Sequence, residues 1–310
     1  MAELFKLNDE LGFPGADKLY LAAKRRGLKV TKAQAKLVAE RNVGGQTVAP
    51  LQPSRGKTVA ENPNARWQMD LAHIANDNKK GDDRYILNVS NVFDRKLYSE
   101  PLETTSPVDV TAALKKIVAR APRLPYTISS DRGIEFTDKR MGNYVNSLGV
   151  AQRFKDVGDV NAIAVVDRSM GLLKRKLANI GAMTGANWGG ALQRATKALN
   201  DEPKEHVLHG ASPNEVKDDE NVKFMLLQDN AKNMVVNQKV VDQREDALKK
   251  TMAFRAPISV NRKFKRGFRA AYGPVIKAES VNKNIVKGRD GLFYSLKTIK
   301  PVPADSRETV

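Results

Sequence analysis

Apolar and polar positions alternate differently in three parts of the chain. Near the N-terminus, residues 16–26 and 31–40 repeat apolar residues at helical spacing, which predicts two helices. Gly27 would stop the first helix, and Thr31 is a suitable N-cap for the second. Such a pair of helices can read a DNA groove, but it can equally be a simple packing module. The predicted inward stripe of the first helix consists of Leu19, Leu21 and Ala22.

The central part begins with short apolar runs that predict strands rather than helices. Residues 67–74, 85–93 and 96–102 suggest an antiparallel meander, 108–120 a helix, and 126–130 a short buried strand. Three strands, a helix and a fourth strand are the order of a ribonuclease-H-like α/β fold. Further helices are predicted at 141–148, 167–183 and 188–200.

The C-terminal part combines a polar helical segment, 235–254, with short β-type runs between glycine turns over 264–300. The runs suit a small β-barrel. Prolines and glycines over 43–64 predict a linker. The predicted domains are a helical module (1–42), a linker (43–64), a ribonuclease-H-like core (65–220), a connecting helix (221–258), a small DNA-binding β-barrel (259–303) and a tail (304–310).

Composition adds charge to this picture. Among 310 residues, Lys and Arg number 53 and Asp and Glu 35, for a net charge of +18. A field of this sign gathers polyanions, so nucleic acid is the leading partner; a basic protein that binds polyanions without chemistry is the plain alternative. No run approaches the roughly 18 apolar residues of a membrane span, and no signal peptide is recognisable. We expect an intracellular protein that is not secreted.

The chain has no cysteine and only three histidines. Disulfides and thiolate zinc sites are therefore excluded, and no zinc is expected. A bound metal would need oxygen ligands, which favours Mg²⁺ or Mn²⁺.

Three aspartates are candidate metal ligands. Asp70 lies on the first predicted strand, Asp131 ends the fourth, and Asp167 begins a helix. These points converge in the predicted fold, and carboxylates there could hold two divalent ions for phosphodiester chemistry. Each has a plainer alternative: a polar strand-edge residue, a turn aspartate, and an acid that interacts with a helix dipole.

Two basic groups are candidates for DNA contacts. One follows Asp167 on the same predicted helix, where a solvated charged face is the alternative; the other is a run without acids, interleaved with two phenylalanines. Phosphate binding is favoured for the second group. The first group is Lys174, Arg175 and Lys176; the second is Arg262, Lys263, Lys265, Arg266 and Arg269.

The surroundings of the aspartates resemble a known family. Asp131-Arg-Gly133-Ile-Glu135-Phe136 is similar to Asp-x-Gly-x-Glu-Phe of integrases, and 35 residues separate Asp131 from Asp167, the retroviral interval. With further matches over roughly 12–303, the chain resembles integrases of Maverick/Polinton DNA transposons and their gypsy-type relatives, in the DDE superfamily. It departs from them at Asp167, where they carry glutamate, and at Asn91, where they usually carry aspartate.

The resemblance implies a DNA integrase that processes 3′ ends and joins them to target DNA, with Asp70, Asp131 and Asp167 as catalytic ligands of two Mg²⁺ or Mn²⁺ ions. It also implies double-stranded DNA partners, a homo-oligomer, and action in the nucleus, or in a virion and host nucleus if virus-borne. Aspartate retracts the third carboxylate by about 1.5 Å relative to glutamate, which predicts reduced activity. The alternative is a degenerate or domesticated integrase that only binds DNA.

Overall fold

A computed structural model describes residues 1–47, 57–74, 83–155, 162–258, 271–282 and 284–303. The described residues divide into two compact units. One contains the described parts of 57–155 and 162–237, and the other contains those of 1–47 and 238–303. Each unit is described by itself below.

The first unit is built on a five-stranded mixed sheet with the order β3-β2-β1-β4-β5. The first three strands pair antiparallel, whereas β4 runs parallel to both β1 and β5. This is the predicted ribonuclease-H-like arrangement, with one strand more than the sequence indicated. The strands are β1 (Arg66–His73), β2 (Tyr85–Asn91), β3 (Leu97–Leu102), β4 (Thr127–Ser130) and β5 (Ala151–Phe154).

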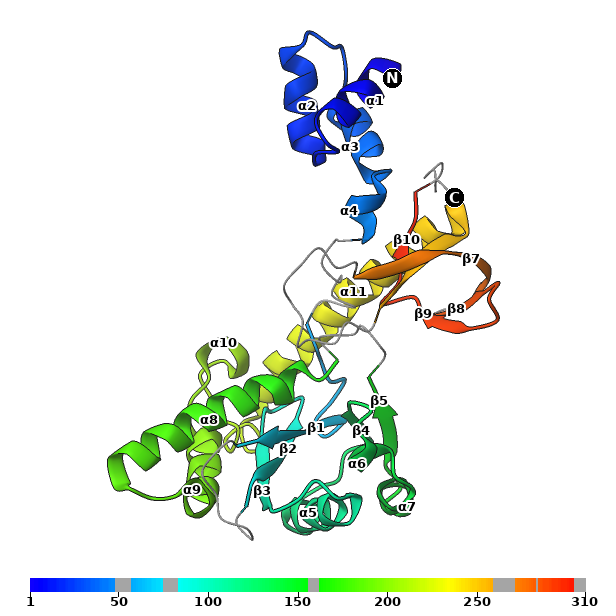
Figure 1. The fold of residues 1–310 in the computed structure, drawn as a ribbon. Helices are drawn as coiled ribbons and strands as arrows, with labels where there is room; N and C mark the ends of the chain where they lie inside the picture. The colour runs from blue at the N-terminus through cyan, green and yellow to red at the C-terminus, as the bar shows by residue number, and fades with distance from the viewer. Residues whose placement is uncertain (48–56, 75–82, 156–161, 259–270, 283, 304–310) are drawn as a thin grey trace. The chain divides into compact units, whose positions relative to one another are not determined.

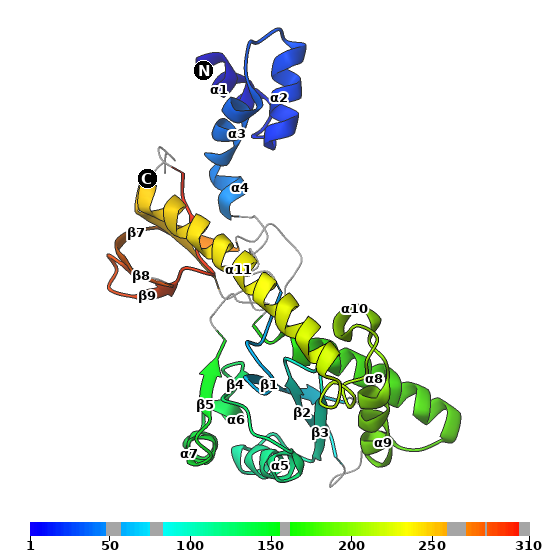
Figure 2. The same ribbon diagram turned by 180° about the vertical axis from the view of Figure 1, so that it is seen from behind.

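Helices cover both faces of this sheet (Figures 1 and 2). On one face, residues of α5 and α7 join the sheet in a core around Trp67. On the other, α8 and α9 pack through a second cluster that includes Met170 and Leu173. The helices of this unit are α5 (Pro107–Arg120), α6 (Ile134–Thr137), α7 (Lys139–Ser147), α8 (Ala164–Thr184), α9 (Trp188–Asp201) and α10 (Glu205–Leu208).

Alternation along β1 assigns its side chains to the two faces. Trp67 and Met69 lie in the cluster with α5, while Ala72 lies in the cluster with α8. Because side chains alternate along a strand, Gln68 and Asp70 share the α8 face with Ala72. The strand therefore presents two polar side chains to the face covered by α8.

The second unit begins with four helices: α1 (Ala2–Glu10), α2 (Ala16–Arg25), α3 (Lys32–Glu40) and α4 (Val43–Thr47). Thr31 caps α3, as predicted, and forms a capping box with Gln34. The predicted stripe of α2 is wrong in part, because Leu19 and Ala23 are buried whereas Leu21 is 59% exposed. The sequence did not predict α1; this helix is short and lacks a side-chain cap, so packing of Leu4 and Leu7 stabilises it.

The C-terminal part contains a five-stranded antiparallel sheet of order β10-β6-β7-β8-β9. An antiparallel sheet agrees with part of the β-barrel prediction. The connecting helix, α11 (Glu220–Thr251), starts 15 residues before the predicted position and ends before Phe254, which belongs to β6. Asp219 caps its first turn by accepting from Val222 N. The strands are β6 (Ala253–Pro257), β7 (Tyr272–Asn282), β8 (Ile285–Gly288), β9 (Phe293–Ser295) and β10 (Lys300–Pro301).

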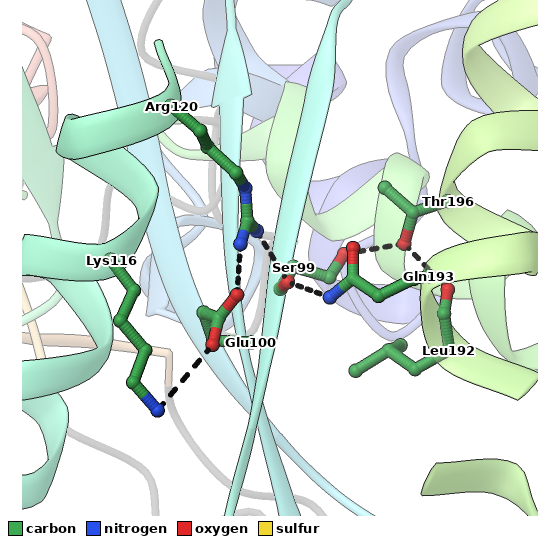
Figure 3. Close-up of polar contacts among 7 residues, drawn as sticks. All are labelled: Ser99, Glu100, Lys116, Arg120, Leu192, Gln193 and Thr196. Carbon is green, nitrogen blue, oxygen red and sulfur yellow. Dashed lines mark hydrogen bonds and ion pairs between the residues drawn. The ribbon is translucent and has the colours of Figure 1, made fainter. Parts of the chain in front are cut away.

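A buried charge on β3 ties the sheet to α5 (Figure 3). Glu100 is 6% exposed and pairs with Arg120, and Lys116 Nζ lies 4.0 Å from its second oxygen. Arg120 also donates to Ser99 O at 2.7 Å. On the other side of the strand, Gln193 of α9 donates to the same carbonyl oxygen at 2.9 Å. Side chains from two helices thus converge on one peptide of β3.

We expect Arg120→Met to lower the free energy of unfolding by about 2–3 kcal/mol, because it leaves the Glu100 carboxylate buried without its main partner. Lys116→Met is the matched control and should cost below about 1 kcal/mol, since Lys116 is exposed. Urea unfolding of both variants measures the difference. Equal effects of the two substitutions would contradict the assignment.

Candidate functional site

The register of two parallel strands brings Asp70 beside Asp131. Trp67 of β1 pairs with Ile128 of β4, and Gln68 with Ser129, an offset of 61 positions. Continued by two residues, this offset aligns Asp70 with Asp131, which directly follows β4. Both aspartates are half-buried.

Asp131 also shapes the turn that follows β4. Its Oδ1 accepts a hydrogen bond from Gly133 N at 3.0 Å. A side chain at position 133 would collide with the Glu135 carboxylate, because a Cβ there would lie 2.6 Å from Glu135 Oε1. The glycine of the Asp-x-Gly-x-Glu motif therefore leaves room for the Glu135 carboxylate in its present position, although this flexible side chain could move to admit a Cβ. The turn-aspartate alternative thus describes part of what Asp131 does.

A buried glutamine attaches the start of α8 to β1. The Gln68 side chain is fully buried, and its Oε1 accepts from Val165 N at 3.0 Å and Val166 N at 3.2 Å. Its Nε2 donates to Ala162 O at 2.9 Å. The first N–H groups of a helix have no partner within the helix, so Gln68 acts as a cap supplied by a neighbouring strand. Asp167, in the first turn of α8, is consequently held near Asp70.

The charges of the three acids influence one another. The pKa of Asp70 is raised to about 6, first by burial and then by the negative charges of Asp167 and Asp131, while Lys155 opposes the rise. Like charges at close range disfavour ionisation. A divalent cation would remove this repulsion, so the electrostatics of the site suit a bound metal ion.

The donor chemistry also fits a hard cation. All three acids offer oxygen, the ligand that Mg²⁺ and Mn²⁺ prefer. Asn88, the cross-strand partner of Asp70, has a buried Oδ1 that accepts no hydrogen bond in the described structure. Even so, no three His, Cys, Asp or Glu side chains among the described residues are close enough to hold a metal as they stand. Asp167 is exposed, and its side chain is one methylene shorter than glutamate. We therefore attribute the incomplete set of three ligands to this position.

The sequence did not single out Gln68 or Lys155 as site residues. The only available signal for Gln68 was a polar residue two positions before Asp70 on the same strand. Lys155 follows β5 and donates its backbone N–H to Ser130 O at 2.9 Å. Because that strand carries no clear apolar alternation, its position beside β4 could not be predicted.

The three basic residues that follow Asp167 point in different directions. Lys174 lies seven positions after Asp167 and thus on the same side of α8, and its Nζ contacts His73 O at 3.4 Å. Lys176 forms an ion pair with Glu202 at 3.3 Å. Arg175 is exposed. The second predicted group, Arg262, Lys263, Lys265, Arg266 and Arg269, lies outside the described residues.

Comparisons with known proteins agree with this geometry. Residues 60–159 match the family described as Integrase core domain. The match includes Asp70 and Asp131 and ends before Asp167. A chain of the simian T-cell lymphotropic virus intasome, solved in complex with the PP2A regulatory subunit B56 gamma, is 15% identical with a TM-score of 0.65. The similarity covers 97% of this chain and 99% of that one. The family match supports an integrase core over residues 60–159, and the structural similarity shows that the fold is shared.

Two further solved structures are similar to about half of the chain. The catalytic core domain of BIV integrase is 22% identical, with a TM-score of 0.42 over 52% of this chain and 99% of that chain. The HTLV-2 integrase core in complex with magnesium is 15% identical, with a TM-score of 0.43 over 51% and 98%. No curated protein matches the chain. In the described parts of the chain, no helix has the length and apolar content needed to cross a membrane.

The raised pKa of Asp70 predicts a pH-dependent stability. The folded value, about 6, lies above the ordinary 3.8, so protonated Asp70 favours folding. This contribution is complete below about pH 3.8 and is lost as the pH rises through about 6. In chelator, Asp70→Asn should therefore be more stable than the unsubstituted protein by about 1–2 kcal/mol at pH 7.5, allowing for partial solvent exposure.

Urea unfolding from pH 4 to 7.5 would measure this difference, which should shrink as the pH falls. Glu103→Gln, at an exposed acid outside the site, should show no such trend. A difference between Asp70→Asn and the unsubstituted protein that stays constant with pH would contradict the electrostatic account.

Gln68→Met should destabilise the protein by about 2–3 kcal/mol, because it removes three hydrogen bonds and leaves buried backbone groups unsatisfied. Gln193→Met, which removes one bond from a more exposed side chain, should cost about 1 kcal/mol or less. Hydrogen exchange should further show faster exchange at Val165 and Val166 in Gln68→Met. Unchanged exchange there would refute the capping role.

Proposed function

We propose that this protein is a DNA integrase, a polynucleotidyl transferase that performs metal-dependent 3′-end processing and strand transfer of mobile-element DNA. One observation carries the proposal: Asp70 on β1 is in register with Asp131, which directly follows the parallel strand β4, and the charge of Asp167 acts on Asp70. The integrase-core match over residues 60–159 supports it. We further propose the Maverick/Polinton type, on the strength of the sequence motifs.

In this proposal, Asp70, Asp131 and Asp167 hold two Mg²⁺ or Mn²⁺ ions. When bound, two such ions activate the attacking oxygen and stabilise the leaving oxygen of a phosphodiester. Asp70 must be ionised to bind metal, and its raised pKa makes this step sensitive to pH near 6. Gln68 orients the start of α8 and therefore Asp167. Lys174, Arg175 and the basic run at 262–269 would contact DNA phosphates, with Lys176 available if its ion pair with Glu202 opens.

The chemistry is an in-line displacement at phosphorus. Water, or a 3′-hydroxyl in strand transfer, forms the new P–O bond as the bond to the departing 3′ oxygen breaks, and the attacking group loses its proton to solvent. Joining two ends requires more than one copy of the chain, so we propose a homo-oligomer on double-stranded DNA. Under this proposal the protein would act in the nucleus, or in a virion and host nucleus if virus-borne.

The exposed Asp167, with its short side chain, also motivates a second candidate function. A degenerate or domesticated integrase would bind duplex DNA without cleaving it. Its binding would weaken by about 10³–10⁵ between 50 and 200 mM salt if six to ten phosphates are contacted. An active integrase would bind DNA with the same dependence on salt, so only a catalytic assay separates the two functions.

A branched DNA that mimics the strand-transfer product allows the reverse reaction to be measured without knowledge of the element ends. We expect Mn²⁺-dependent resolution of this substrate by the purified protein. Asp70→Asn and Asp131→Asn should each lower the rate by at least about 10³-fold, whereas Glu103→Gln should not change it. Asp167→Glu should increase the rate by up to about 10²-fold, since it restores the reach of the carboxylate.

Activity that persists in Asp70→Asn would refute the proposed ligand set. Absence of activity in both the unsubstituted protein and Asp167→Glu, combined with salt-sensitive DNA binding, would favour the second candidate.

A further inference from the structure

A basic cavity of about 460 Å³ lies within the unit that contains the mixed sheet. It is separate from the strand edge that carries Asp70 and Asp131, neither of which lines it. Its volume is in the range of small-molecule sites. The ionisable residues along its wall are Lys57, Arg95, Arg168, Lys204, His206 and Asp229.

Arg95 is the most unusual of these residues. It occupies the tight turn between β2 and β3 with a positive φ of 62°, a conformation that costs energy for any residue other than glycine. Its Nη1 atom is buried and donates no hydrogen bond within the described residues. A buried guanidinium nitrogen without an acceptor is costly, which indicates that the acceptor comes from beyond the described residues.

Nearby carboxylates do not supply that acceptor. Asp94 accepts instead from Lys96 N at 2.9 Å and from Asn91 Nδ2 at 3.0 Å, bonds that shape the turn. Asp229, the one acid on the wall, lies 3.1 Å from His209 Nε2 and 3.9 Å from Lys232 Nζ. Neither His209 nor Lys232 lines the cavity, so Asp229 is already engaged outside it.

The remaining wall is therefore positive. Lys57, Arg95, Arg168 and Lys204 contribute four cations. When Asp229 on the wall and the neighbouring Asp94 are both counted as ionised, two positive charges remain. Burial lowers the pKa of Arg95 to about 10, with Arg168 acting in the same direction and Asp94 against it. Arg95 thus stays protonated at neutral pH. Mutual repulsion of Arg95 and Arg168 is relieved when an anion lies between them.

We propose that this cavity binds a phosphate-bearing ligand of up to mononucleotide size, with Arg95 as its main anchor. Phosphate suits the site because its oxygens accept from several directions at once, as cations from separate elements require. The ligand could be a free phosphorylated small molecule or a phosphate of bound DNA; both sources present the same chemistry. The proposal does not depend on the catalytic role of the three aspartates.

Binding of inorganic pyrophosphate and of deoxyadenosine monophosphate is measured by calorimetry in chelator, so that no metal-dependent step contributes. We expect dissociation constants at or below about 1 mM for the unsubstituted chain. Arg95→Gln should weaken binding by at least about tenfold, and Arg95→Lys by less, because it keeps the charge but loses the planar fork. Arg194→Gln, the same change at an exposed arginine outside the cavity, should weaken it by less than about twofold.

A second measurement separates binding from folding. Without ligand, Arg95→Gln should melt at the same temperature as the unsubstituted chain or higher, because it removes an unsatisfied buried charge. A clear fall in melting temperature would show that Arg95 is structural and would overturn the proposal. So would an absence of binding by the unsubstituted chain, or an equal loss in Arg194→Gln.

Competition identifies the source of the phosphate. If a duplex oligonucleotide displaces pyrophosphate and Arg95→Gln weakens both, the cavity receives DNA phosphate. If pyrophosphate and duplex bind together, the site serves a free phosphorylated molecule. Asp70→Asn should bind pyrophosphate as the unsubstituted chain does, which keeps this result distinct from the outcome of the catalytic assay.

Discussion

The arrangement of the candidate site depends on one buried side chain, Gln68. Its amide satisfies two N–H groups and a carbonyl at the start of α8, so the helix begins at a fixed point on β1. Asp70 is two residues further along the same strand, and Asp167 is in the first turn of the same helix. This contact fixes the start of α8, and packing of Met170 and Leu173 on the sheet holds the turns that follow.

Electrostatic repulsion is the cost of bringing these acids together. A pKa of about 6 for Asp70 means that folding leaves its carboxylate in a less favourable setting than water does. The three aspartates offer oxygen ligands and repel one another, and the side-chain carbonyl of Asn88 is buried without a hydrogen bond. A cation bound among these groups would stabilise them. The basic cavity near Arg95 has the opposite character, since it gathers positive charge around an unsatisfied guanidinium. The same unit therefore contains one site that suits a cation and one that suits an anion.

Local signals were sufficient where a residue's own neighbours decide its structure. Thr31 is the predicted N-cap of α3, and the structure adds Gln34, which completes a capping box through bonds to adjacent backbone groups. Predictions failed where contacts distant in sequence decide the outcome. Leu21 was expected inside α2 but is exposed, because the partner helices contact the side that carries Leu19 and Ala23. Strand β5 has little apolar alternation and is stabilised by its pairing with β4.

The sequence by itself determined the order of elements in the core and the three aspartates as candidates, because strand and helix periodicity and short motifs are local properties. Only the tertiary structure decided that β4 lies beside β1 in the register that aligns Asp70 with Asp131. It also revealed Gln68 as the cap of α8 and Arg95 as an unsatisfied cation on a cavity wall. These features arise from contacts between residues that lie far apart in the chain, and such contacts leave no local pattern in a single sequence.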